Sequence, residues 1–239
     1  MPEQLTFPLA GLPPATFENF VPGRNVEAVD TLMRFARNEV AETGLVIWGA
    51  DGAGRTHLLK SAVALAQGRG VHATYVDAET LGEETFDDVA LVAIDDVDRA
   101  GEVAQARLFT LYNALAARRA HLVASARMPP ATMPLRDDLR TRLAWGLVIE
   151  VLPLADEDKP DALAAFARER GFRLEPEAIA YLLAHGRRDM PSLVQALVAL
   201  DQRSLALQRP ISVPLIREWM QHERVSPGRS GNDKPTSGA

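Results

Sequence analysis

The most constraining feature of this sequence is a glycine-rich loop between a short apolar run and a helical pattern. Residues 45–48 read Leu-Val-Ile-Trp, and Gly49-Ala50-Asp51-Gly52-Ala53-Gly54-Arg55-Thr56 follows directly. This spacing matches the phosphate-binding pattern G-x-x-x-x-G-K-[ST], in which backbone N–H groups surround a phosphate and the next helix adds positive potential. The sequence therefore predicts a nucleotide-binding α/β domain. A glycine-rich turn without a ligand is the alternative interpretation.

Two positions of this loop carry chemistry beyond the backbone. Thr56 is expected to offer its hydroxyl to Mg²⁺. Arg55 stands where the pattern has lysine. Arginine keeps the positive charge but presents a planar fork in place of a compact ammonium group. We therefore expect nucleotide binding to tolerate this change better than hydrolysis does.

A second motif strengthens the prediction of a nucleotide site. Leu91-Val92-Ala93-Ile94 is an apolar run that ends in Asp95 and Asp96. In a nucleotide-binding domain, Asp95 is expected to hold Mg²⁺ through water, and Asp96 to orient or activate the attacking water. Taken alone, the pair of carboxylates is also typical of a turn. Asp98 is interpreted as a solvated loop residue.

The order of patterns predicts two folded domains. Short apolar runs typical of buried strands alternate with helical patterns in the first part, which predicts a three-layer αβα domain with a mostly parallel sheet. The strands are expected at 45–48, 72–76, 89–94, 121–125 and 147–151, and the helices at 25–42, 58–67 and 103–117. A small all-α domain is predicted to follow, with helices at 161–170, 176–184, 191–207 and 213–223.

The predicted boundaries place an extended arm at residues 1–15, the α/β domain at 16–154, the all-α domain at 155–224 and a disordered tail at 225–239.

The net charge is −6, from 26 Lys and Arg against 32 Asp and Glu. This balance argues against a general nucleic-acid coat protein. There is no cysteine, which excludes disulfides and thiolate metal sites. Neither a membrane-spanning apolar run nor a secretory signal is recognised, so we expect a cytoplasmic protein.

Together these motifs resemble the AAA+ domain of the DnaA-related family. Residues 54–59 are similar to its extended phosphate loop, including His57, and residues 16–25 to the segment that packs on adenine. Residues 139–147 resemble the box that carries an arginine finger, and residues 186–190 the part of the lid that carries a sensor arginine. The resemblance implies that ADP or ATP with Mg²⁺ is bound, and that Thr56 and Asp95 serve the metal. The implied nucleotide-binding residues are Val21, Asn25, Gly49, Gly52, Ala53, Gly54, Arg55, Thr56, His57 and Arg188.

The same resemblance implies two catalytic roles and a regulatory function. Arg142 matches the finger, which acts in trans on ATP bound by a neighbouring molecule, and Arg140 is a competing candidate for this role. Asp96 is the implied catalytic carboxylate of the chain's own site. The family's acidic sensor position is Ala126 here. Together with Arg55, this predicts slow intrinsic turnover and a nucleotide that acts structurally. The layout, without the initiator's N-terminal and DNA-binding domains, resembles the members of the family that inactivate DnaA and so limit re-initiation of replication.

The arm carries a further resemblance. Gln4-Leu5-Thr6-Phe7-Pro8-Leu9 is similar to the short motif that binds the sliding clamp, the β subunit of DNA polymerase III. Leu5, Phe7 and Leu9 would be apolar anchors, Gln4 would bond at the pocket's mouth, and Pro8 would limit the unbound ensemble. The implied partners are this clamp and DnaA, near the nucleoid, without sequence-specific DNA binding or a membrane.

Several alternatives stay open at this stage. The arm could fold back on its own domain, and the chain could form homo-oligomers. The protein could also be a self-sufficient AAA+ ATPase that acts as a loader or remodelling motor, or a non-catalytic adaptor. The five histidines show no metal-ligand spacing. Trp48, Trp145 and Trp219 are interpreted as core or domain-junction residues.

Overall fold

The computed structural model describes residues 13–82 and 84–225. Its first part alternates strands and helices: α1 (Val26–Ala36), β1 (Gly44–Trp48), α2 (Arg55–Gly68), β2 (Ala73–Asp77), β3 (Leu91–Asp95), α3 (Glu102–Ala117), β4 (His121–Ala126), α4 (Asp137–Ala144) and β5 (Leu147–Glu150). Short 3-10 helices lie at Ala78–Thr80, Val97–Arg99 and Pro130–Thr132. Four helices follow: α5 (Lys159–Glu169), α6 (Pro176–His185), α7 (Met190–Leu207) and α8 (Val213–Val225).

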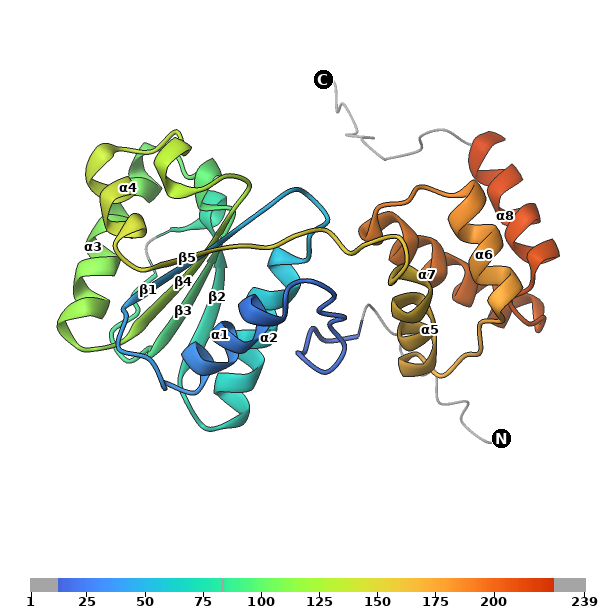
Figure 1. The fold of residues 1–239 in the computed structure, drawn as a ribbon, viewed down its shortest axis with the longest axis horizontal. Coiled ribbons are helices and arrows are strands. Elements are labelled where there is room, and N and C mark those ends of the chain that lie inside the picture. Colours follow the sequence, from blue (N-terminus) through green and yellow to red (C-terminus); the bar gives the residue numbers. More distant parts are fainter. Residues whose placement is uncertain (1–12, 83, 226–239) are drawn as a thin grey trace, which may run out of the picture. The chain divides into compact units, whose positions relative to one another are not determined.

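The five strands form one parallel sheet in the order β2-β3-β4-β1-β5 (Figure 1). Strand β1 lies between β4 and β5, with Val46 paired with Ala124 on one side and with Val148 on the other. The fold class and all five predicted strands are confirmed. Their positions follow from continuous apolar runs, because a strand in a parallel sheet is covered on both faces.

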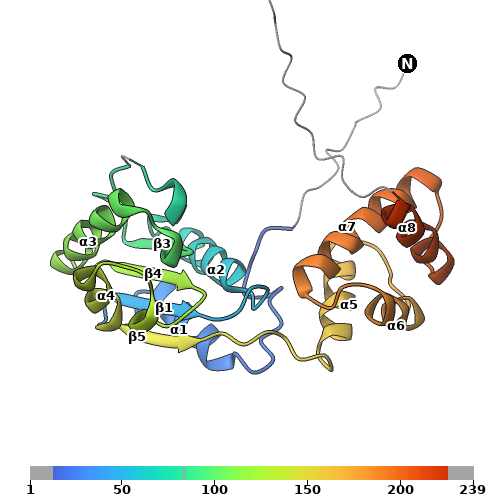
Figure 2. The ribbon, with the colours of Figure 1, turned by 90° about the horizontal axis from the view of Figure 1, so that it is seen from above.

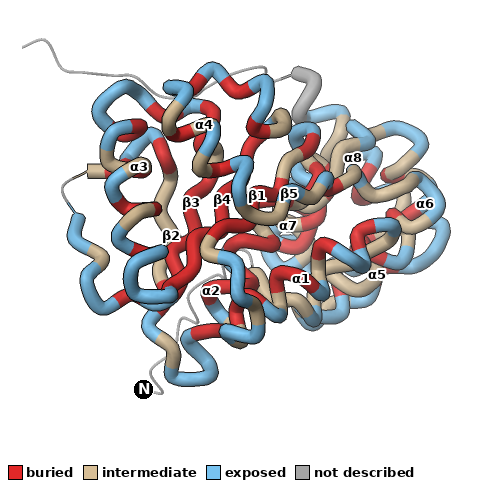
Figure 3. The backbone as a smooth tube through the Cα atoms, turned by 60° about the vertical axis from the view of Figure 1, so that its left-hand side comes forward, coloured by how far each residue is buried: buried red, intermediate tan, exposed pale blue. Residues whose placement is uncertain are grey.

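Alternate residues of each strand face two different cores. Val46, Val92 and Leu122 pack in one cluster with residues of α3 and α4. Their neighbours Leu45, Leu91 and Val123 pack in the other cluster with residues of α1 and α2. Figure 1 shows these helix pairs on the two faces of the sheet, and Figure 3 shows that the central strands β1, β3 and β4 are buried. The result is the predicted three-layer arrangement.

The carboxyl ends of the parallel strands meet at one edge of the sheet. The glycine loop follows β1 at this edge, and Asp96 follows β3. Ser125 is the next-to-last residue of β4, paired with Ile47 of β1. In open α/β sheets, ligands bind at this end of the strands. The sheet therefore brings the two predicted motifs together, although about forty residues separate them in sequence.

The described chain divides into two compact units, the larger ending at Ala165 and the smaller beginning at Phe166. Helices α6, α7 and α8 of the smaller unit lie together (Figure 2). A buried ion pair joins its first residues to α7, since Arg170 Nη2 lies 2.8 Å from Asp201 Oδ2. The predicted all-α character of this region is confirmed. No helix in the described part of the chain is both long and apolar enough to cross a membrane.

Two helices differ from the sequence expectation. Helix α1 ends at Ala36 rather than at residue 42, because Asn38 adopts a left-handed conformation with φ 59° and its N–H closes on the Phe35 carbonyl. Helix α4 was not expected. Only Leu139 and Leu143 are buried among its eight residues, so its apolar pattern is too short to mark a helix.

Candidate functional site

The glycines of the loop are required by close backbone approach. Gly54 caps α2 with φ 97°, and a Cβ there would lie 2.7 Å from Cε2 of Phe20. A Cβ on Gly49 would lie 2.1 Å from the Val151 carbonyl oxygen. Gly52 has φ 80°, a conformation that favours glycine. The loop therefore presents bare backbone at the N-terminus of α2, which is the arrangement that binds phosphate.

Arg55 turns back into its own loop. The residue is 7% exposed, and its Nη1 donates to the Gly49 carbonyl at 2.8 Å. Its Nη2 lies 3.2 Å from Asp51 Oδ1 and 3.3 Å from Asp96 Oδ1. The planar fork thus ties the loop to the residue that follows β3. A lysine ammonium could not reach these partners with the same fixed geometry.

Both carboxylate oxygens of Asp95 accept a hydrogen bond from a hydroxyl group. Asp95 is buried, and it accepts a hydrogen bond from the Tyr75 hydroxyl at 2.7 Å and another from the Ser125 hydroxyl. Burial and the neighbouring Asp95 raise the pKa of Tyr75 well above its usual value. Ser125 Oγ also accepts from the Asp96 N–H at 2.9 Å. Sequence reasoning missed this role of Ser125, although a hydroxyl in the run His-Leu-Val-Ala-Ser was a usable signal.

Asp96 sits in a strained and partly desolvated position. Its φ of 48° is left-handed, which a non-glycine residue adopts at a cost. Burial is the main cause that raises the pKa of Asp96, and the charge of Asp95 adds to it. The guanidinium groups of Arg55 and Arg99 oppose this rise. Such a combination of strain and a shifted pKa is common at functional sites.

The interpretation of Asp98 as a solvated residue is wrong. Its side chain is fully buried, and Oδ2 accepts from Arg127 Nε at 2.7 Å. The Arg127 backbone N–H also points to Oδ1 at 3.3 Å. This pair fastens the loop after β3 to the end of β4, which supports the carboxylates next to it.

The segment before α1 lies against the phosphate loop. Phe20 contacts the His57 ring at a centroid distance of 5.5 Å, and His57 Nε2 lies 3.0 Å from the Thr16 carbonyl oxygen. Asn25 forms a two-way bond with the backbone of Leu152, at 2.8 Å and 2.7 Å. The amide of Asn25 thus fixes the chain after β5, and Val21 beside it is half-buried. The predicted roles of Val21, Asn25 and His57 in binding nucleotide stay predictions.

The residues present fit the phosphate groups of a nucleotide. The cradle offers backbone N–H groups, a helix N-terminus and a buried cation, and Thr56 is exposed at the first turn of α2. The predicted roles of Thr56 and Asp95 toward Mg²⁺ stay predictions. Within the described residues, no group of three or more His, Asp or Glu is placed to hold a metal ion.

Arg142 lies apart from this cradle, in the last turn of α4. Its guanidinium carbon lies 4.2 Å from the centre of the Trp145 ring and 5.7 Å from that of Phe109. Within the part of the chain that the structure describes, no carboxylate lies within 4.0 Å of Arg142. By contrast, Arg140 pairs with Asp137 at 2.5 Å. The two candidate fingers therefore differ, since only Arg142 keeps its donors unpaired in this region.

The remaining predicted residues lie elsewhere. Arg188 is exposed just before α7, whose N-terminus is capped by Asp189 accepting from the Ser192 N–H at 2.9 Å. Gln4, Leu5, Phe7, Pro8 and Leu9 fall outside the described residues. Trp145 is 64% exposed, so its interpretation as a core residue is wrong, and its alternative place at a domain junction stays a prediction.

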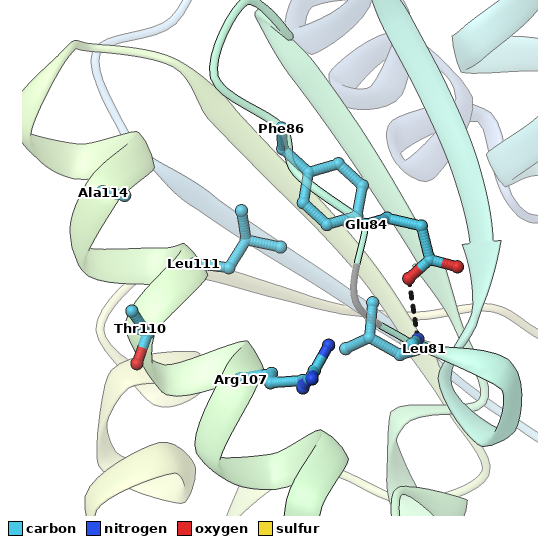
Figure 4. A pocket seen from close by; sticks show the side chains of 8 residues that line it. Leu81, Glu84, Phe86, Arg107, Thr110, Leu111 and Ala114 are labelled. Carbon is cyan, nitrogen blue, oxygen red and sulfur yellow. Dashed lines mark hydrogen bonds between the residues drawn. The ribbon is translucent and has the colours of Figure 1, made fainter.

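A cavity of about 250 Å³ lies between α3 and the chain after β2. Figure 4 shows Leu81, Phe86 and Leu111 around it, with Arg107 at one side. Glu84 does not face it as a free acid, because its Oε2 accepts from the Gly82 N–H at 2.7 Å. None of the predicted site residues lines this cavity.

Residues 156–220 match a family model described as "Hda, lid domain". These residues are therefore similar to the lid domain of Hda. Across the larger part of the chain, the structure is similar to solved AAA+ proteins. Domain III of the Thermotoga maritima replication initiation protein DnaA superimposes with a TM-score of 0.78 at 23% identity, covering 89% of this chain and 98% of that one.

Two further structures support the same fold. AMPPCP-bound DnaA from Aquifex aeolicus matches with a TM-score of 0.71 at 22% identity, covering 89% of this chain and 70% of that one. RuvB from Thermotoga maritima matches with a TM-score of 0.65 at 14% identity, over 89% and 74% of the two chains. The chain therefore has a fold of the kind found in DnaA and RuvB, and its residues 156–220 are similar to an Hda lid.

Proposed function

We propose that this protein is an Hda-type regulator that stimulates hydrolysis of the ATP bound to DnaA and so limits re-initiation of replication. In this proposal it binds ADP or ATP with Mg²⁺ in its own cradle, docks on the DNA polymerase sliding clamp, and works in the cytoplasm near the nucleoid. The similarity of residues 156–220 to an Hda lid and the likeness of the fold to DnaA domain III support the choice of partner.

The observation that carries the proposal is that the guanidinium of Arg142 forms no ion pair within the described residues. Hydrolysis of ATP builds negative charge on the transferring phosphoryl group, and a cation supplied from a second molecule stabilises that charge. Arg142 keeps its N–H donors unpaired by any carboxylate in the described residues and lies at the end of α4. It is thus available to a neighbouring molecule, whereas Arg55 is committed to its own loop.

The same contrast disfavours a self-sufficient ATPase. In the chain's own site, Asp96 pairs with Arg55 and Asp95 is bonded to Tyr75 and Ser125. A carboxylate that is already paired must give up one of these partners before it can orient an attacking water. Weak own-site turnover therefore accompanies the proposed activity.

The finger is tested by replacing Arg142 with alanine and measuring hydrolysis of DnaA-bound ATP on the clamp. The stimulated rate should fall by roughly 10³–10⁵, the usual contribution of a finger, or about 4–7 kcal/mol of transition-state stabilisation. Folding, ADP binding and clamp binding should persist. Arg142→Lys should rescue poorly, because an ammonium group lacks the planar fork.

Arg140→Ala is the matched control, two residues away on the same helix. Because Arg140 already pairs with Asp137, its removal should have a milder effect. Full stimulation by Arg142→Ala combined with loss in Arg140→Ala would move the finger to Arg140. Full stimulation by both variants would leave only the adaptor role.

The clamp contact is tested separately, in the arm. Replacing Gln4, Leu5 and Phe7 with alanine should abolish binding to purified clamp in a pull-down. Nucleotide affinity and melting temperature should not change, because the motif is proposed to act as an extended peptide. Undiminished clamp binding by the triple variant would contradict the proposed clamp contact of the arm. It would not affect the proposed role of Arg142.

A further inference from the structure

Trp145 is a large apolar side chain left on the surface beside the proposed finger. It follows α4 directly, and 64% of its surface is exposed. Its ring lies under the guanidinium of Arg142, 4.2 Å from the guanidinium carbon. The distance is well inside the range of about 6 Å within which a cation and an aromatic face attract each other.

A ring and a carboxylate hold an arginine in different ways. A carboxylate bonds to the N–H groups at the edge of the guanidinium, as Asp138 does for Arg136 at 2.8 Å. A ring contacts only the flat face and leaves the donors at the edge open. Arg142 is therefore restrained without losing the charge or the donors that a phosphate needs.

A second ring limits the movement of Arg142 further. Phe109, in the middle of α3, lies 5.7 Å from the guanidinium carbon. Its side chain is anchored, because it packs against the core cluster between the sheet and α3. Arginine otherwise loses considerable rotamer freedom when it docks, and restraint before docking reduces that loss.

We propose that Trp145 is a positioning residue for Arg142, holding the guanidinium by its face so that its edge enters the ATP site of the partner already oriented. This rests on the proposed function, since the finger must act before it can be positioned. The stack uses residues three apart on one helical turn, so the local fold alone sets it.

The test compares three variants at position 145 by single-turnover hydrolysis of DnaA-bound ATP on the clamp. Trp145→Ala should lower the maximal stimulated rate roughly 2- to 30-fold, the range that corresponds to exposed and desolvated cation–π contacts. The half-saturating concentration should change much less. Trp145→Phe should retain most of the rate because it keeps an aromatic face, and Trp145→Leu should behave like alanine.

A spectroscopic measurement reports the stack without DnaA. The Arg142 Nε–H resonance, assigned with Arg142→Ala, should be shifted by the Trp145 ring and move toward its free-arginine position in Trp145→Ala. The melting temperature should not change in any variant, because Trp145 is exposed. A double-variant cycle completes the test: Trp145→Ala should have no further effect on the rate once Arg142 is alanine.

The outcomes separate this inference from the proposed function. If Arg142→Ala stimulates hydrolysis like the wild type, the proposed function fails and the positioning role fails with it. If Arg142→Ala is inactive but Trp145→Ala keeps the full maximal rate, only the positioning role is overturned. A change confined to the half-saturating concentration, or equal rates for Trp145→Leu and Trp145→Phe, would also overturn it and make Trp145 a plain contact residue.

Discussion

The phosphate loop and the end of α4 each present one arginine, and the two side chains have opposite surroundings. Arg55 is buried and bonds to the Gly49 carbonyl and to the carboxylates of Asp51 and Asp96. Arg142 is only half-buried and contacts aromatic faces without a carboxylate within 4.0 Å among the described residues. The guanidinium of Arg55 stabilises the chain's own loop, whereas the guanidinium of Arg142 can still bind a phosphate group of a neighbouring molecule. This difference explains why we assign catalysis to a neighbouring site rather than to the chain's own loop.

The largest difference between the two regions should appear in stability. Arg55→Met removes one partner of a mostly buried ion pair and leaves Asp96 without it, which should cost about 1–3 kcal/mol of unfolding free energy. Arg142→Met, a matched change at the surface, should stay within about 0.5 kcal/mol. Urea denaturation of both variants at neutral pH measures this contrast. Equal losses would mean that Arg55 does not fasten the loop.

A substitution at Arg55 should change nucleotide affinity less than it changes stability. Arg55→Lys restores the residue usual in the phosphate loop, so it should leave the affinity for ADP with Mg²⁺ within about tenfold of the wild type, or about 1.4 kcal/mol. Intrinsic hydrolysis should rise, because a lysine no longer bridges the Gly49 carbonyl to Asp96. Calorimetry and a turnover assay measure the two effects. Absence of both heat and a melting shift in the wild type would refute the nucleotide site.

The smallest effect concerns Asp96 and pH. Its folded pKa is raised, mainly by burial, so the folded state disfavours the ionised carboxylate relative to the unfolded chain. This penalty is absent below the ordinary carboxyl pKa, where both states are protonated, and it appears as the pH rises above that value. Asp96→Asn removes the penalty and suits the left-handed backbone. Melting curves should therefore favour the variant more at pH 7 than at pH 3.5. A difference that does not vary with pH would contradict the assignment.

Much of the fold could be predicted because the central strands are apolar at most of their positions. Strands β1, β3 and β4 are buried along almost their whole lengths, and such runs mark a parallel sheet covered on both faces. The spacing of the glycines was enough to predict the phosphate loop between β1 and α2. Helix α4 escaped prediction because two buried leucines in eight residues do not establish a helical period.

The site was harder to predict than the fold, because its bonds join residues far apart in sequence. Arg55 and Asp96 are 41 residues apart, and Asp98 and Arg127 are 29 apart. Nothing local indicates that Arg55 turns toward Asp96 or that Asp98 is buried. Arg142 was found from a motif, but its contact with Trp145, three residues later, depends on helix α4, which the sequence pattern did not predict.

The central claim is that the hydrolysed ATP belongs to the partner and not to this chain. The most direct measurement loads this protein with ADP, removes free nucleotide, and adds it with the clamp to DnaA that carries labelled ATP. The account predicts that the labelled ATP is hydrolysed at the full stimulated rate, because an ADP-filled site has no γ-phosphate to lose while Arg142 still reaches the other site. Hydrolysis that appears only when this chain itself carries ATP would contradict the account.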